Sequence, residues 1–388
     1  MMNNKESIQH AADSMNGKKS CLLSTEKGFS LVELMITIVT FLFIVAAASS
    51  VFTSLFTQFK QQSKIGETNI EGVIGLDMLR WDIEHAGYGL PHGGLIAYTE
   101  VNGDPFSLND APTDIPRAII SRSNAVYAAP NNIFNESDYL AIKSSAVALN
   151  NTTAGKWNYL TTVAGNPLLN VWTPAAENVP EGGRGIVISS GNRTLITNAG
   201  SFSARCCTNA VANIASFAPG PNETYLLYGV NHNTDLRRPF NRVDYYIDRP
   251  AANMPQRCAP NTGVLERAVV NQGNDSLNPQ PVLDCVADMQ VVYALDNDEN
   301  GEFIDGVGGD VYTDTLALLS AEDIRRRVKE VRVFVLAHEG QRDATYEHPT
   351  PIVVGPDAAL GRAFALAGTD RNYRWKVYTI VVKPYNLR

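Results

Sequence analysis

The stretch KGFSLVEL, residues 27–34, opens a long apolar run and decides the architecture of this chain. From Leu34 to Phe59 no charged residue occurs, and Leu, Ile, Val, Phe and Ala dominate. A bilayer core requires about 20 apolar residues in a helix, so the run is long enough to span a membrane. Glu33 places a carboxylate at the start of the run, where a charge costs at least about 2.5–3.5 kcal/mol on insertion scales and requires a partner.

The residues around this carboxylate closely resemble the processing site of type IV prepilins. The resemblance rests on residues 27–33 and the apolar run behind them. It implies that a prepilin peptidase cleaves between Gly28 and Phe29 and that Phe29 is N-methylated. Residues 1–28 would then be a removed leader, which a start at Met15 would shorten.

Two simpler explanations of the apolar run leave Glu33 unexplained. An ordinary secretory signal would be cut after its apolar core, where Ala46–Ser50 imitates a cleavage site, but the charge-free run continues beyond it. A plain signal anchor tolerates the length but does not require a carboxylate. Lys18, Lys19 and Lys27 precede the run closely, which places the N-terminus in the cytoplasm and the bulk of the chain outside it.

Beyond Lys60 the apolar pattern becomes amphipathic. Apolar residues recur at spacings of three and four, which places them on one face of a helix. They are Val73, Leu76, Leu79, Ile83 and Ala86. The sequence GYGLP at 87–91 then ends the helix. We expect one helix within residues 29–89, membrane-spanning in its first half and packed on a domain in its second.

The sequence of this second half of the helix predicts two further features. Asp82, like most charged residues here, is expected to fall off the apolar face. Gly66, Gly72 and Gly75 should each weaken the helix by about 1 kcal/mol relative to Ala.

Residues 90–388 are the exported part, which is large enough for a sizeable core or for two lobes, about 90–235 and 236–388. Strand patterns dominate it. The predicted strands are Tyr139–Val147, Gly185–Ser190, Leu195–Thr197, Tyr225–Val230, Val243–Asp248, Val264–Val270, Val286–Leu295, Val328–Ala337 and Trp375–Lys383. Residues 101–137 and 150–182 are expected to be ordered loops or an inserted lobe. A long helix followed by antiparallel strands predicts an α+β, pilin-like fold.

A narrower resemblance to minor pilins of the PilW family covers several blocks of the chain. The blocks are Leu79–Gly89, Val264–Val269, Val286–Tyr293, Ile324–Val335 and Tyr373–Arg388. The resemblance implies a role in type IV pilus assembly or initiation, in a tip or priming complex. It also implies a single-pass inner-membrane location with a periplasmic domain, followed by transfer to the pilus.

The same resemblance implies the partners. They are other major and minor pilins, bound through the N-terminal helix, the prepilin peptidase and the inner-membrane assembly platform. We expect the Glu33 carboxylate to meet the Phe29 amino group of a neighbouring subunit during assembly. Two alternatives stay open: a large pseudopilin of a type II secretion tip, or an adhesin-type pilin with a binding lobe at 91–225.

Charge and motifs argue against nucleic-acid binding and against catalysis. The formal net charge is −8, and removal of the leader, whose net charge is +1, would leave −9. There is no basic patch of the kind that binds nucleic acid. Metalloprotease, serine-hydrolase and phosphate-loop motifs are absent from the sequence, and the histidines are scattered.

Four cysteines would remain after processing: Cys206, Cys207, Cys258 and Cys285. An even number in an exported protein favours disulfides. Four cysteines allow three full pairings, and the sequence leaves the connectivity open. A bond between neighbouring cysteines is strained, which disfavours Cys206–Cys207, whereas Cys258–Cys285 would close a loop of about 27 residues. A zinc site is disfavoured because the Cys-x-x-Cys spacing and a nearby histidine pair are missing.

The sequence DNDENGE, residues 296–302, fits the first half of a calcium loop. Oxygens at alternate positions followed by a turn-forming Gly are what a cage around Ca²⁺ requires. The candidate ligands are Asp296, Asp298, Asn300, Glu302 and, in place of the usual distal Glu, Asp305. The competing interpretation is an acidic turn after the strand that ends at Leu295.

Overall fold

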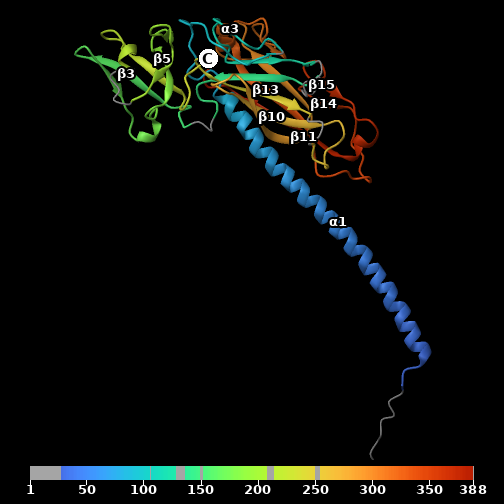
Figure 1. The fold of residues 1–388 in the computed structure, drawn as a ribbon. Coiled ribbons are helices and arrows are strands. Elements are labelled where there is room, and N and C mark those ends of the chain that lie inside the picture. Colours follow the sequence, from blue (N-terminus) through green and yellow to red (C-terminus); the bar gives the residue numbers. More distant parts are fainter. Residues whose placement is uncertain are drawn as a thin grey trace, which may run out of the picture. The chain divides into compact units, whose positions relative to one another are not determined.

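A computed structural model describes residues 28–104, 106–127, 136–148, 152–207, 214–249 and 254–387. The chain divides into two compact units, Met1–Phe59 and Lys60–Arg388. Helix α1 spans Leu31–Glu84 (Figure 1), which confirms the single long helix. It ends before Gly87 and Gly89, whose positive φ angles of 81° and 68° suit glycine and close the helix. Of the expected leader, residues 1–27 lie outside the described part.

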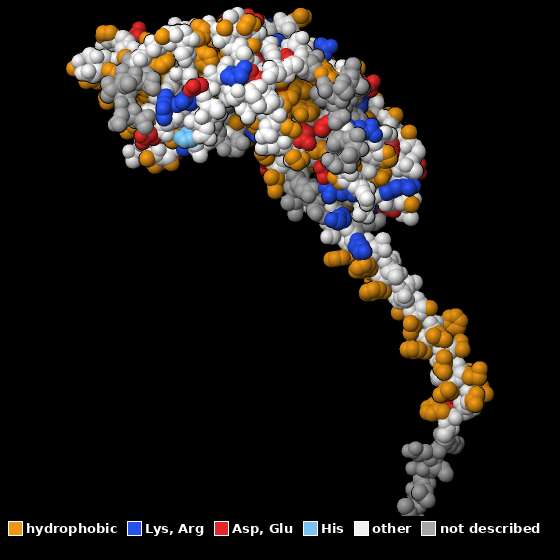
Figure 2. Space-filling view, viewed as in Figure 1, with side chains coloured by type: hydrophobic (Ala, Val, Ile, Leu, Met, Phe, Trp, Pro, Cys, Tyr) orange, Lys and Arg blue, Asp and Glu red, His pale blue; other side chains and the backbone are white. Residues whose placement is uncertain are grey.

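The first part of α1 exposes apolar side chains all round. Figure 2 shows hydrophobic side chains along this segment, and Leu31, Phe43 and Phe52 are among the most exposed of them. Leu31–Gly66 forms a helix long and apolar enough to cross a membrane, and no second such helix occurs among the described residues. Apolar surface of this extent suits lipid or other apolar helices, which suggests that the segment anchors the chain in a membrane.

The second unit is built on a main sheet. Within the described residues it has eight antiparallel strands, in the order β1-β2-β9-β10-β11-β13-β16, with β12 paired to β11. The strands are β1 (Ile119–Arg122), β2 (Tyr139–Ser144), β9 (Asn241–Asp248), β10 (Gly263–Val270), β11 (Leu277–Leu295), β12 (Val311–Thr313), β13 (Val328–Glu339) and β16 (Arg374–Val382). In the centre, Val291 of β11 lies opposite Val333 of β13, where β-branched side chains pack well.

The part of the chain that lies between β2 and β9 in the sequence forms a second sheet. Its order is β4-β3-β8-β5-β6, with β7 paired to β5. The strands are β3 (Trp157–Val163), β4 (Asn166–Asn170), β5 (Arg184–Ser189), β6 (Leu195–Ile196), β7 (Ala204–Arg205) and β8 (Tyr225–Asn231). The stretch 150–182, expected to be loop or inserted lobe, thus contributes β3 and β4 (Figure 1). The last strand of this sheet, β8, ends at Asn231, while β1 and β2, which precede the sheet in the sequence, belong to the main sheet.

Short elements complete the second unit. The β14–β15 hairpin packs on one face of the main sheet, where Val354 joins a buried cluster with Phe334 and Trp375. The elements are helix α3 (Ala321–Arg327), strands β14 (Ile352–Val354) and β15 (Arg362–Phe364), and 3-10 turns η1 (Ala175–Glu177), η2 (Ala215–Phe217) and η3 (Gly368–Asn372). The basic run 325–327 ends helix α3, where positive charge suits the helix dipole, and β13 begins directly after it at Val328.

The last part of α1 packs on the opposite face of the sheet. Leu79 and Ile83 are fully buried in the core, whereas Val73, expected on this face, is 57% exposed. Gly75 explains the difference. A Cβ there would collide with the carbonyl oxygen of Val282 on β11, so the missing side chain lets helix and strand approach closely. The face of α1 that carries Gly75 therefore packs on the sheet, and Val73 lies on the exposed face.

Candidate functional site

The expected processing site lies immediately before α1. Gly28 and Phe29 are non-helical, and the first helical hydrogen bond runs from the Leu34 N–H to the Ser30 carbonyl, 3.0 Å. Glu33 lies in the first turn, where a carboxylate is favoured by the helix dipole. No described residue of the same chain forms an ion pair or hydrogen bond with the Glu33 side chain.

A second carboxylate on the same helix has partners within its own domain. Asp82 is fully buried, and its carboxylate accepts two hydrogen bonds from Arg267 of β10, at 2.7 and 3.2 Å. The Tyr245 hydroxyl of β9 donates to it at 2.6 Å. Burial opposes the charge of Arg267, but the hydrogen bond and the charge of Asp82 raise the pKa of Arg267 above its ordinary value. The expectation that Asp82 lies off the packed face is therefore wrong.

This ion pair was missed because its partners are far apart in the sequence. Arg267 follows Asp82 by 185 residues, so no local spacing links them. The available signal was an arginine inside the apolar strand Gly263–Val270. A buried charge in a strand requires an opposite charge facing it.

The four cysteines form two bonds. Cys258 and Cys285, whose pairing the sequence left open, are joined across a sequence separation of 27. Cys206 and Cys207 are also joined, so the preference against that neighbouring bond is wrong. The 206–207 pair belongs to the core of the second sheet, where Cys206 is fully buried.

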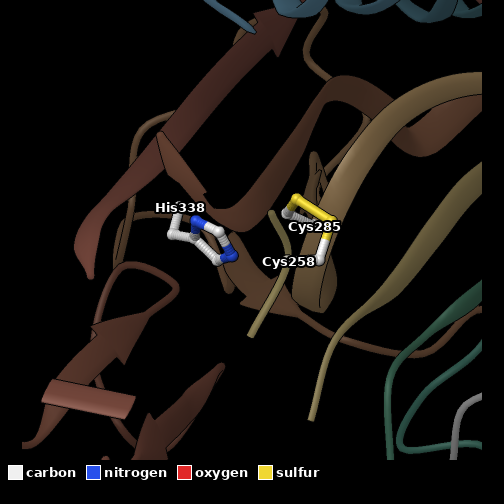
Figure 3. A group of neighbouring side chains, drawn as sticks. All are labelled: Cys258, Cys285 and His338. Carbon is white, nitrogen blue, oxygen red and sulfur yellow. A yellow bond between two sulfur atoms is a disulfide. The ribbon is translucent and has the colours of Figure 1, made fainter. Parts of the chain in front are cut away.

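A buried histidine lies beside the Cys258–Cys285 bond (Figure 3). His338 of β13 accepts a hydrogen bond at Nε2 from the Ala259 N–H, 2.8 Å, so Nδ1 carries the proton of the neutral ring. Burial, and then the charge of Arg257, lower the pKa of His338 to about 4. The cysteine sulfurs and the imidazole lie within 4.8 Å of one another, but sulfurs joined in a disulfide cannot serve as thiolate ligands.

The acidic loop brings together a different ligand set from the one the sequence predicts. Carboxylates of Asp296, Asp298 and Asp310 lie within 4.8 Å of one another. Glu302 and Asp305, also predicted as ligands, are exposed and lie outside this group, so the structure does not bring them together with it. Asp310 replaces them because a glycine-rich turn, 306–309, returns the chain to the start of β12.

Backbone hydrogen bonds hold this loop together. Asp310 accepts from the N–H groups of Asn297 and Ile304, at 2.8 and 2.9 Å. Asn300 donates its side-chain amide to Asp298, 3.0 Å, which keeps Asn300 beside the carboxylates. Lys329 lies 3.4 Å from Asp296 and supplies part of the positive charge that a cation would provide. The group has the oxygen chemistry of a Ca²⁺ site.

The comparison with protein families agrees with this architecture. Residues 244–386 match the model of the PilW family, described as type IV pilus-assembly protein W. The matched stretch runs from β9 to the end of β16, across the strands that hold Arg267 and Cys285. The match supports a type IV pilus protein of the PilW family over this C-terminal part of the chain. No curated protein and no solved structure matches the chain.

Proposed function

We propose that this chain is a minor pilin that is processed between Gly28 and Phe29 and enters a tip or priming complex. The observation that carries the proposal is Glu33, a carboxylate without a partner among the described residues, at the start of a membrane-anchor helix that continues into a PilW-family domain. The pilus family supports a role in pilus assembly. The helix supports anchoring in the membrane, with the domain in the periplasm before extraction into the pilus.

The mechanism follows from the cost of two isolated charges. Cleavage after Gly28 would leave a new α-amino group on Phe29, close to lipid. A single charge in an apolar medium is costly, whereas two opposite charges in contact offset much of that cost. The Phe29 amino group of one subunit and the Glu33 carboxylate of another would therefore select a defined register between neighbouring helices. Assembly, not chemistry, would be the work of this segment.

Mass spectrometry of the protein from its native membrane tests the processing step. The mature chain should begin at N-methylated Phe29, and Gly28→Ala should leave the longer precursor unassembled. Ser30→Ala is the matched control, because it changes a neighbouring small residue and should be processed normally. An N-terminus near Ser49, or an intact leader on assembled protein, would contradict the proposal.

The neighbouring class, a pseudopilin of a type II secretion tip, makes the same prediction about Phe29. Crosslinking of the mature protein in cells separates the two. Capture of pilus components, including the major pilin, supports the minor pilin. Capture of secretion components alone would assign the chain to the other system.

A further inference from the structure

A polar cleft of about 430 Å³ lies where the second sheet joins the main sheet. Its walls come from the end of β8, the start of β9 and the turn between β10 and β11. No Asp, Glu, Lys or Arg side chain lines it among the described residues, and amide side chains predominate. Its volume falls within the range of roughly 300–1,000 Å³ typical of small-molecule sites.

Two asparagines in the cleft use their oxygen to fix turns and leave their amino groups available. Asn231 Oδ1 accepts from the Asn233 N–H at 2.9 Å, and Asn271 Oδ1 accepts from the Gly273 N–H at 2.7 Å. Neither Nδ2 donates to any described residue. The turns hold both side chains in place, so two amino groups of cleft-lining residues remain available as donors.

One further group complements these donors. The amide of Asn241 is used within the fold, because it is almost fully buried and donates to the carbonyl oxygens of Val230 and Val147, at 2.9 and 3.2 Å. The complementary group is Nδ1 of His232, which is buried and has no hydrogen-bond partner among the described residues. A buried polar atom left without a partner costs about 1–3 kcal/mol, which a suitable ligand would recover.

The chemistry of these groups defines the ligand class. The amide donors of Asn231 and Asn271 and the unpartnered ring nitrogen of His232 match vicinal hydroxyl groups, each of which donates and accepts. The partly buried Val269 adds a small apolar surface suited to the C–H face of a sugar ring. A ligand with a full charge would find no Asp, Glu, Lys or Arg among the described lining residues.

We propose that this cleft binds a neutral carbohydrate unit of one or two sugar rings. The site lies outside the assembly helix and goes beyond the proposed role in pilus assembly. Through this cleft the exported domain would bind glycans on a surface that the protein meets. The binding groups come mainly from residues 231–278, after the lobe 91–225 to which the sequence assigned a possible adhesive role.

The test uses the full chain in a detergent without a sugar headgroup, because a glycoside detergent would compete. The immobilised probes are maltose, lactose, chitobiose and mannobiose, with sialyllactose as the charged comparator. Asn271→Asp and Asn231→Asp keep the turn-fixing oxygen but replace the donor by an acceptor, so the fold should persist. Asn274→Asp is the matched control: it adds the same charge in the same turn, and its oxygen also accepts locally, from Ser276, outside the cleft.

We expect at least one neutral probe to bind, with at least tenfold weaker binding in Asn271→Asp or Asn231→Asp and unchanged binding in Asn274→Asp. Melting temperatures of all three variants should stay at the wild-type value, and either of the two cleft variants suffices if the other unfolds. Absence of binding to every neutral probe overturns the proposal. So does binding to sialyllactose alone, or an equal loss in the control.

Discussion

The two ends of helix α1 each carry a carboxylate, and the two are satisfied in different ways. Asp82 is fully buried and pairs with Arg267 and Tyr245 of the same domain. Glu33, in the apolar part of the helix, pairs with no described residue of its own chain. A charge in apolar surroundings requires a partner. The domain end of the helix is therefore completed by folding, and we infer that the membrane end is completed by another subunit.

The largest effect on the folded domain should come from Asp82→Ala. Removing one partner leaves Arg267 charged and buried, which costs about 3–5 kcal/mol of unfolding free energy. Asp77→Ala, on the exposed side of the same helix, should change stability by less than about 0.5 kcal/mol. Denaturant unfolding of both variants in detergent measures the difference. Equal stability would show that the domain end of the helix does not depend on this pair.

The Cys258–Cys285 bond holds the strand on which the helix rests, because Cys285 follows Val282 on β11. Replacing both cysteines by Ala should cost about 3–4 kcal/mol in the loop-entropy model, given the separation of 27 residues. Replacing Cys206 and Cys207 should cost less, because neighbouring residues close almost no loop. Unfolding of the two double variants under oxidising conditions compares them, and the opposite order would refute the assignment.

Calcium binding by the acidic loop remains a prediction. If Ca²⁺ binds Asp296, Asp298 and Asp310, a hundredfold excess over the dissociation constant should stabilise the chain by about 2.7 kcal/mol. Asp298→Asn should abolish this gain, whereas Asp305→Asn, outside the carboxylate group, should keep it. Thermal unfolding in calcium and in chelator measures it. If the wild type melts at the same temperature in calcium and in chelator, the loop is only an acidic turn that pairs with Lys329.

Two glycines of α1 should respond to alanine with opposite signs. Gly75→Ala forces the helix away from Val282 and should destabilise by about 1–3 kcal/mol. Nothing lies within 4 Å of a Cβ at Gly66, so Gly66→Ala should stabilise the helix by up to about 1 kcal/mol. Unfolding midpoints of the two variants would reveal the sign. If both variants are destabilised, helix α1 is already closely packed at Gly66, which would contradict the structure.

Only part of this structure could be predicted from the sequence. The helix and six of the eight strands of the main sheet were predictable because their apolar runs are long and periodic. Strands β1 and β12 were not, because they have only four and three residues. Strand β4 was missed as well, since Asn166–Asn170 is short, partly exposed and lies on a sheet edge. The Asp82–Arg267 pair and the role of Asp310 depend on contacts between distant segments. Such contacts cannot be inferred from a local sequence pattern. Glu33 could be identified because the apolar residues around it are its neighbours in the sequence.

The most direct test of the comparison is the fate of Glu33→Gln, which removes the charge and keeps the shape. Thr37→Val is the matched control, because it alters a polar residue one helical turn further into the same apolar run. Each variant is followed by its membrane level, its unfolding midpoint and its recovery in pilin complexes after crosslinking. The account predicts wild-type levels and stability for both, with Glu33→Gln alone lost from the complexes. Incorporation of Glu33→Gln at the wild-type level would contradict it.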